Sequence, residues 1–174
     1  KMQAGVEVTT DEAQRIIDIY RSANHKIKAL WRAAGDMLAY LQRGDACNFG
    51  KKGVLEVDTD EQGILLPSGL YLRYPDLRAE EGDMGYEYSY KVRNGWKYVY
   101  GGAVVENVCQ AIARCIIGEQ MILINKRYRP VLTVHDSVVC CVPDEVVDEA
   151  RVYIEECMSV TPGWAAGLPV ACES

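Results

Sequence analysis

The first forty residues carry two apolar stripes at helical spacing. Thr9 and Glu12 stand three residues apart, as in a capping box, and Asp11 suits the positive end of a helix dipole. Apolar side chains then recur at helical spacing up to about residue 23. They are Ile16, Ile17, Ile19 and Tyr20. A second stripe, from about residue 26 to 41, stops before Gly44. The pattern predicts two helices whose stripes face a core.

Residues 44–101 change in character, because glycine, tyrosine and β-branched residues replace alanine. Residues 65–72 read as two short strands around a Pro-Ser-Gly turn. Residues 86–90 and 91–100 read as a hairpin whose turn is Asn94-Gly95. This part of the chain is predicted to be rich in strand.

The longest apolar helix is predicted from residue 102 to about 126, and a hairpin follows it. We expect four of its side chains to be buried against that hairpin: Val105, Val108, Ile112 and Ile116. Two apolar runs, 131–134 and 138–142, flank His135-Asp136 and predict antiparallel strands with this pair exposed at the tip. Residues 144–158 complete the pattern as an amphipathic helix. The predicted class is α+β, with helices packed on an antiparallel hairpin or sheet.

Composition narrows the class of protein. The chain has 174 residues, 49% of them apolar and 25% charged, which fits one soluble globular unit with a real core. We see no run approaching the roughly 20 apolar residues of a membrane span, and no signal peptide at the start, so no membrane partner is expected. The seven cysteines include no Cys-x-x-Cys pair, which favours free thiols and the cytoplasm. The net charge of −6 means that any contact with DNA must be local.

The polar tripeptide His135-Asp136-Ser137 holds three residue types that occur in catalysis. A nucleophilic triad is excluded, because neighbouring residues of a strand point to opposite faces and a tight turn separates them further. Two interpretations remain. Asp136 is a metal-binding carboxylate on a rigid buried hairpin, or it is an ordinary turn residue, for which aspartate is well suited.

Three further segments share a resemblance with this hairpin. Residues 133–139 read Thr-Val-His-Asp-Ser-Val-Val and resemble motif C of family A DNA polymerases, usually Val-His-Asp-Glu. Residues 100–102 and 106–114 resemble the helix before motif C in phage and prophage members, and residues 161–170 resemble their C-terminal segment. Residues 6–31 are similar to the fingers helices that follow motif B. The resemblance runs in order from about residue 5 to 173 and is weakest over 44–98.

The resemblance implies a role for four residues. Asp136 matches the metal-binding aspartate of motif C, and His135 matches its neighbour near the primer terminus. Gln110 matches the glutamine that touches the minor groove there. Arg114 lies one helical turn further on, where it contacts either DNA or an acidic side chain. Gln110, Arg114 and the hairpin tip are expected near one another, with Gln110 and Arg114 on an open face. Two Mg²⁺ ions would serve nucleotidyl transfer in the complete enzyme.

Two departures from the family pattern limit this assignment. Ser137 stands where the family usually has glutamate, and a hydroxyl adds no charge. Motif A, which supplies the other metal-binding aspartate, is missing, and residues 87–89 (Glu-Tyr-Ser) imitate it out of family order. The isolated chain is therefore expected to be inactive, unless another acid such as Glu106 completes the site.

The resemblance implies a C-terminal piece of a DNA-directed DNA polymerase of phage or prophage type, acting in the bacterial cytoplasm. Residues 1–43 would belong to the fingers, 44–100 to a β-rich insertion, and 101–174 to the C-terminal palm. Its partners would be primer-template DNA, deoxynucleoside triphosphates and the upstream segment with motifs A and B. The alternatives are a non-catalytic DNA-binding or interaction module that kept the palm fold, and an unrelated globular domain.

Overall fold

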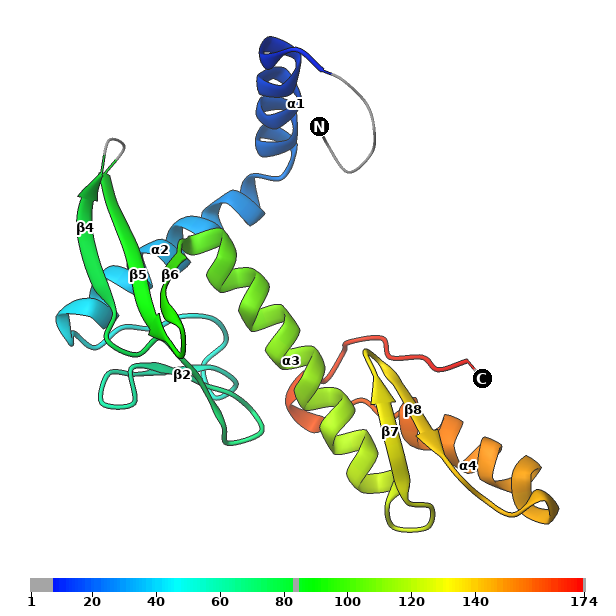
Figure 1. Ribbon diagram of the computed structural model, residues 1–174. Helices are drawn as coiled ribbons and strands as arrows, with labels where there is room; N and C mark the ends of the chain where they lie inside the picture. Colours follow the sequence, from blue (N-terminus) through cyan, green and yellow to red (C-terminus); the bar gives the residue numbers. More distant parts are fainter. Residues whose placement is uncertain (1–7, 83–84, 174) are drawn as a thin grey trace.

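The computed structural model describes residues 8–82 and 85–173 and has a mixed helix and sheet architecture, as expected for an α+β chain. Two helices lead into two small antiparallel sheets, a long helix crosses the molecule, and a hairpin and a last helix follow (Figure 1). The long helix joins the part of the molecule built from residues before 100 to the part built from residues after 124.

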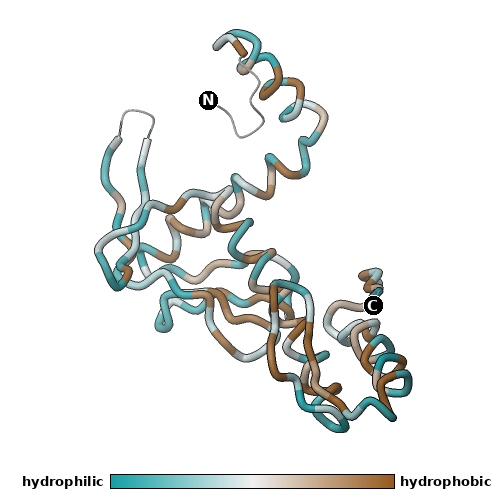
Figure 2. Tube along the Cα trace, turned by 45° about the vertical axis from the view of Figure 1, so that its right-hand side comes forward, coloured by the Kyte–Doolittle hydropathy of each residue, from teal (hydrophilic) through white to brown (hydrophobic). Residues whose placement is uncertain are grey.

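The first helix, α1 (Thr10–Ala23), begins at the predicted capping box. The Thr9 side chain accepts a hydrogen bond from the backbone of Glu12, and the Glu12 carboxylate accepts one from the backbone of Thr9. The expectation that its apolar stripe faces a core is wrong, because no residue of α1 is buried. Its exposed apolar residues are Ile16, Ile17, Ile19 and Tyr20. The helix stands out from the rest of the chain (Figure 2), and the ring of Tyr20 stacks with that of Trp31 on α2 while the isoleucines stay exposed.

The second helix, α2 (His25–Arg43), is buried only over its second half. Ala34, Met37, Leu38 and Leu41 enter the main core, whereas Ile27 and Leu30 are exposed. The helix ends where Gly44 adopts a left-handed backbone, at φ 74°, which suits a residue without a side chain. The predicted end of the second apolar stripe is thus confirmed.

The first sheet contains β1 (Glu56–Asp58), β2 (Gly63–Leu65) and β3 (Tyr71–Arg73), all antiparallel and in that order. The two strands predicted around the Pro-Ser-Gly turn are β2 and β3. Gly69 closes the turn with its backbone N–H, which donates to the carbonyl of Leu66 at 2.9 Å.

The second sheet contains β4 (Arg78–Gly82), β5 (Gly85–Val92) and β6 (Gly95–Val99), also antiparallel and in chain order. The predicted hairpin is β5–β6, but its turn lies one residue earlier, at Arg93-Asn94, because Val92 pairs with Gly95. Strand β4 was not predicted, since its sequence Arg-Ala-Glu-Glu-Gly has no β-branched or aromatic residue.

The long helix α3 (Gly101–Ile124) takes part in two separate cores. Its first half packs with α2 and the two sheets, and its last turns pack with α4 (Val147–Met158) and the hairpin. The expected contact of Val108 with the hairpin is therefore wrong, because Val108 lies in the first core. Val105 and Ile112 are only partly buried there, while Ile116 is buried. The spacing of apolar residues identified which face of α3 is buried. Which element covers that face depends on how the later segments of the chain fold back onto the helix.

Helix α3 is long and apolar enough, by length and composition, to cross a membrane, which corrects the expectation that no stretch comes near this limit. That expectation counted uninterrupted apolar residues, whereas the helix contains a few polar and charged side chains, among them Glu106 and Arg114, within a segment that is apolar on average. A core helix of a soluble protein can meet the same criterion, so one such helix is weak support for a membrane protein.

The last helix is tied to α3 by a buried amide. A single 3₁₀ turn, Asp144–Val146, precedes α4, in agreement with the predicted start at residue 144. The side chain of Gln120 is 1% exposed and its Nε2 donates to the carbonyls of Met158, at 2.6 Å, and Val160, at 3.1 Å. The indole of Trp164, in a second 3₁₀ turn (Gly163–Ala165), donates to the carboxylate of Glu119 at 2.6 Å.

Candidate functional site

The polar tripeptide lies on an antiparallel hairpin, as predicted. Strands β7 (Pro130–Val134) and β8 (Ser137–Cys140) pair through Val134 with Ser137 and Thr133 with Val138. His135 and Asp136 form the two-residue turn, and both side chains are exposed. Strand β8 begins one residue before its predicted start and ends two residues before its predicted end.

The turn holds one residue in an unfavourable backbone conformation. His135 has φ 53°, in the left-handed region that few residues other than glycine adopt. A two-residue hairpin turn requires a positive φ at a central position, so this conformation follows from the turn itself. No described hydrogen bond joins His135, Asp136 and Ser137 to one another, in keeping with the exclusion of a triad.

The Asp136 carboxylate is available for a cation. Among the residues that the structure describes, it takes part in no hydrogen bond or ion pair. The strand beneath it is anchored on one face only, where Val138 and Cys140 pack on the core that contains Ile124 and Met158. The hairpin therefore fixes the backbone of Asp136 while its charge stays uncompensated.

The opposite face of the hairpin is apolar and bare. Leu132 is 57% exposed, Val134 51% and Val139 43%, and their pairing sets them on one side of the two strands. A two-stranded hairpin is marginally stable by itself and gains stability when a further strand or helix covers it. This face is a surface that the described chain leaves without a packing partner.

Two cavities meet at Asp136. One, of about 430 Å³, lies between β8, α4 and residues 172–173, and the other, of about 330 Å³, lies between α3 and residues 170–173. Asp136, Ser137 and Glu173 line both cavities. Sequence reasoning missed Glu173, because nothing near residue 173 indicates that the tail returns to the hairpin.

The sequence predicted that the hairpin tip lies near the first half of α3. The structure instead places it beside the second half. The residues of α3 that line a cavity with Asp136 begin at Ala113 and extend to Gln120, in the second half of the helix. Gln110 is exposed on an earlier turn and donates to the Glu106 carboxylate at 3.2 Å. The hairpin packs on the end of α3 because it follows that helix after a short turn.

The expectation of an open face at Gln110 and Arg114 is confirmed, since both side chains are exposed. Arg114 forms no ion pair in the described part of the chain, so no acidic side chain occupies it there. Glu106, named from the sequence as a candidate to complete a metal site, accepts a hydrogen bond from Gln110. These residues form a polar strip on α3, separate from the hairpin tip.

The ligand set for a metal ion is incomplete. The described residues contain no group of three or more histidine, cysteine, aspartate or glutamate side chains that could hold an ion. A carboxylate oxygen is the donor that Mg²⁺ prefers, so Asp136 has the right chemistry for one ligand. Asp136, beside the uncharged Ser137, shares its cavities with the Glu173 carboxylate, and two carboxylates fall short of such a group.

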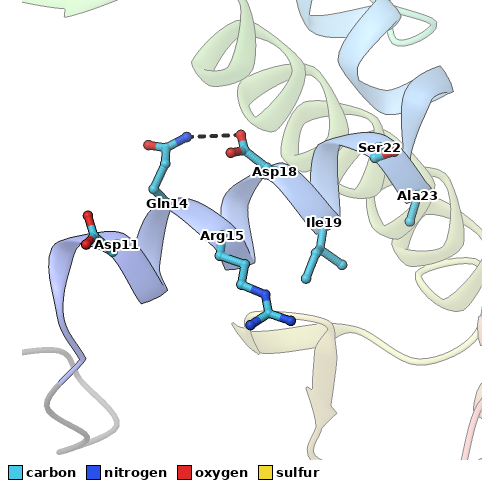
Figure 3. A pocket seen from close by; sticks show the side chains of 7 residues that line it. All are labelled: Asp11, Gln14, Arg15, Asp18, Ile19, Ser22 and Ala23. Carbon is cyan, nitrogen blue, oxygen red and sulfur yellow. Dashed lines mark hydrogen bonds between the residues drawn. The ribbon is translucent and has the colours of Figure 1, made fainter.

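A larger hollow lies elsewhere, along α1, and has a volume of about 830 Å³. All of its lining residues come from α1, and one hydrogen bond, from Gln14 to Asp18 at 3.0 Å, joins two of them (Figure 3). A hollow bounded by one helix has no second wall to enclose a ligand. It is an open surface of α1 and not a binding site.

Comparison with known proteins finds similarity to a DNA polymerase. No family model matches the chain, and no solved structure matches it. It is similar to a DNA polymerase of Bacillus phage SP02, with 33% identity over 178 residues. The match covers 93% of this chain and 26% of the phage protein, so the chain spans about a quarter of the length of this relative. The chain is therefore related to a phage DNA polymerase.

Proposed function

We propose that the chain takes part in template-directed DNA synthesis, as the segment of a family A DNA polymerase that carries the motif C hairpin. The observation that supports this most directly is the exposed, uncompensated Asp136 at the tip of an antiparallel hairpin. The chain is similar to a phage DNA polymerase over 93% of its length, which suggests nucleotidyl transfer as the reaction in which that carboxylate takes part.

In this proposal Asp136 is one ligand of the metal ions. Two Mg²⁺ ions, when bound in such an enzyme, stabilise the attacking 3′-oxygen and the leaving pyrophosphate of the nucleotide. No group of three or more metal-ligating side chains surrounds Asp136 among the described residues, so a further carboxylate would come from the part of the polymerase that the alignment leaves uncovered. The task of this chain is to hold Asp136 at a fixed position.

The remaining site residues would contact DNA. His135, beside Asp136 on the turn, would meet the primer strand, and Gln110 would contact the minor groove near the primer terminus. Arg114 lies one turn beyond Gln110, exposed and without a described ion pair, which favours DNA over an acidic partner for it. Deoxynucleoside triphosphates would be the other substrates.

The exposed apolar surfaces of α1 and of the hairpin are consistent with this chain being one part of a larger polymerase. We assign residues 1–43 to the fingers, 44–100 to an inserted β-rich segment and 101–174 to the palm. The exposed stripe of α1 and the bare hairpin face would then pack against other parts of the polymerase. We assign the enzyme to the bacterial cytoplasm, with no membrane partner, because one half of α3 enters a core with α2 and its last turns enter another with α4.

Primer extension tests the proposal. The purified 174-residue chain, with Mg²⁺ and all four nucleotides, is expected to give no product, because one carboxylate cannot offset the cost of partly dehydrating Mg²⁺. Joined in frame to an upstream polymerase segment with motif A, the chain should extend a primer. Asp136→Asn should then reduce synthesis to background, and the exposed Asp144→Asn should retain it.

Two outcomes would contradict this account. Synthesis by the isolated chain would mean that another of its acids completes the site. Retained synthesis in the Asp136→Asn form of the joined protein would remove Asp136 from catalysis. If the joined protein bound primer-template but never extended it, a non-catalytic DNA-binding module would be the better description.

A further inference from the structure

The second sheet has one covered face and one bare face. Strand pairing sets Tyr88, Tyr90 and Val99 on one side, where they pack with α2 and α3 in the main core. The other side, here called the outer face, carries Arg78 and Glu80 on β4, Glu87, Ser89 and Lys91 on β5, and Trp96 and Tyr98 on β6. Tyr100 follows β6 in an extended conformation, and its ring lies beside Gly102 at the start of α3. No described helix packs on the outer face, although Ser89, which accepts a hydrogen bond from Arg78, is only 4% exposed.

Three aromatic rings follow one another along the outer face. Trp96, Tyr98 and Tyr100 occupy alternate positions of one extended segment and are 42%, 68% and 68% exposed. Alternate residues of a strand lie about 7 Å apart. This is about twice the 3.4 Å spacing of nucleotides along a strand of duplex DNA, so the rings suit an extended strand with separated bases.

A hollow beside two of these rings offers room for a flat group. It has a volume of about 370 Å³ and is lined by residues 98–100 and by residues 86–88 at the beginning of β5. No described hydrogen bond uses the hydroxyl of Tyr98 or Tyr100. Large aromatic side chains that are this exposed and adjacent commonly mark a binding surface.

Positive charge lies at the other end of the aromatic row. The Arg78 guanidinium lies 3.8 Å from the centre of the Trp96 ring, and its Nε donates to Ser89 at 2.9 Å and faces Glu80 at 3.2 Å. The Lys91 ammonium lies 5.1 Å from the same ring. The Trp96 ring and Ser89 thus hold the Arg78 guanidinium in position. Its two Nη groups take part in no described hydrogen bond, so they remain available to bind phosphate.

Two acidic residues share this face with the cations. Glu80 and Glu87 pair with each other across β4 and β5; Glu80 also forms an ion pair with Arg78, and Glu87 lines the hollow beside Tyr98 and Tyr100. The outer face is thus mixed in charge, and Lys91 is a cation on it without an ion pair among the described residues. This local arrangement matters more for binding than the net charge of −6.

We propose that the outer face binds single-stranded nucleic acid, with bases stacked on Tyr98 and Tyr100 and the sugar-phosphate backbone held by Arg78 and Lys91. Exposed aromatic rings interleaved with cations are the common platform for such strands. A duplex hides the faces of its bases, so it would not use the rings. The inference rests on the proposed function only for its expected ligand, the unpaired part of a DNA template.

Fluorescence anisotropy of labelled oligo(dT), measured with the 174-residue chain at low salt, tests the inference. We expect saturable binding that is weaker by about fivefold or more after either Tyr98→Ala or Tyr100→Ala. Tyr40→Ala is the matched control, because Tyr40 is also exposed but lies on α2. Tyr98 and Tyr100 are so exposed that their removal should leave the circular dichroism spectrum unchanged.

Salt dependence supplies a second readout. Lys91→Ala should reduce the slope of log affinity against log salt by about 0.7, as expected when one phosphate contact to a single strand is lost. Lys97→Ala is its control, since Lys97 pairs with Tyr90 on the covered side of the sheet. Stronger binding of duplex than of oligo(dT) would overturn the proposal, and so would no binding, or equal losses in the control variants. Because the assay needs no synthesis, it can fail while the primer-extension test succeeds.

Discussion

At the scale of single residues, two glutamines on α3 have opposite environments. Gln120 is buried and its amide donates to the carbonyl of Met158, the last residue of α4, and to that of Val160 just beyond it. Gln110 is exposed, and its described hydrogen bond is to Glu106. Buried carbonyl groups that lose their donor cost more than exposed ones, which water can satisfy. The same residue type thus stabilises the fold at one position and remains available for a ligand at the other.

This contrast gives a prediction for stability. Gln120→Leu should lower the free energy of unfolding by about 2 kcal/mol, because the carbonyls of Met158 and Val160 lose a buried donor. Gln110→Leu should change it by less than about 0.5 kcal/mol, as is usual for an exposed position. Urea unfolding followed by circular dichroism measures both, and equal effects would mean that the tie between α3 and α4 has no energetic importance.

At the scale of elements, the contact of α2 with α3 depends on a close backbone approach. A Cβ built on Gly101, the first residue of α3, would lie 1.9 Å from the carbonyl oxygen of Trp31 and 2.9 Å from the backbone nitrogen of Gly35. Only glycine allows the start of α3 to sit against α2 at this distance. The direction in which α3 leaves the main core therefore depends on one residue.

Two alanine substitutions on α3 test this. Gly101→Ala should destabilise the chain by about 3 kcal/mol, since the clash is with backbone that cannot rotate away. Gly118→Ala should stabilise it by about 0.5 to 1 kcal/mol, because nothing lies within 4 Å of the added carbon and alanine favours a helix. Thermal unfolding of the two variants should shift in opposite directions; a tolerated Gly101→Ala would contradict the packing described here.

At the scale of the whole molecule, Tyr74 joins several elements. It is 1% exposed, its ring packs edge-on against Tyr90 at 5.2 Å, and its hydroxyl accepts a hydrogen bond from the Asn107 amide of α3 at 3.3 Å. Burial raises the pKa of Tyr74 from the usual value near 10 to about 12, because a phenolate is poorly solvated there.

Alkaline unfolding should therefore depend on this residue. The folded chain keeps the Tyr74 proton between pH 10 and 12 while the unfolded chain releases it, so stability falls as the pH rises through that window. The loss attributable to Tyr74 should approach about 2 to 3 kcal/mol, and Tyr74→Phe should remove this part of the pH dependence. Melting temperatures measured from pH 8 to 12 for both proteins provide the test; identical profiles would exclude Tyr74 as the cause.

The sequence by itself determined what depends on neighbours along the chain. The capping box of α1, the glycine that ends α2, the β5–β6 hairpin and the two strands around His135-Asp136 all follow from local spacing and turn chemistry. Local signals also place Asp136 on an exposed tip. They do not reveal β4, whose charged sequence forms a strand because β5 offers it a partner.

Only the tertiary structure decided which apolar faces are covered and which polar residues meet. The stripe of Ile16 and Ile19 has the same periodicity as that of Leu38 and Leu41, yet one is exposed and the other buried. Periodicity orients a face but cannot say what lies opposite. Likewise, Asp136 shares its cavities with Glu173 and the second half of α3, since contacts between distant segments follow from how whole elements pack.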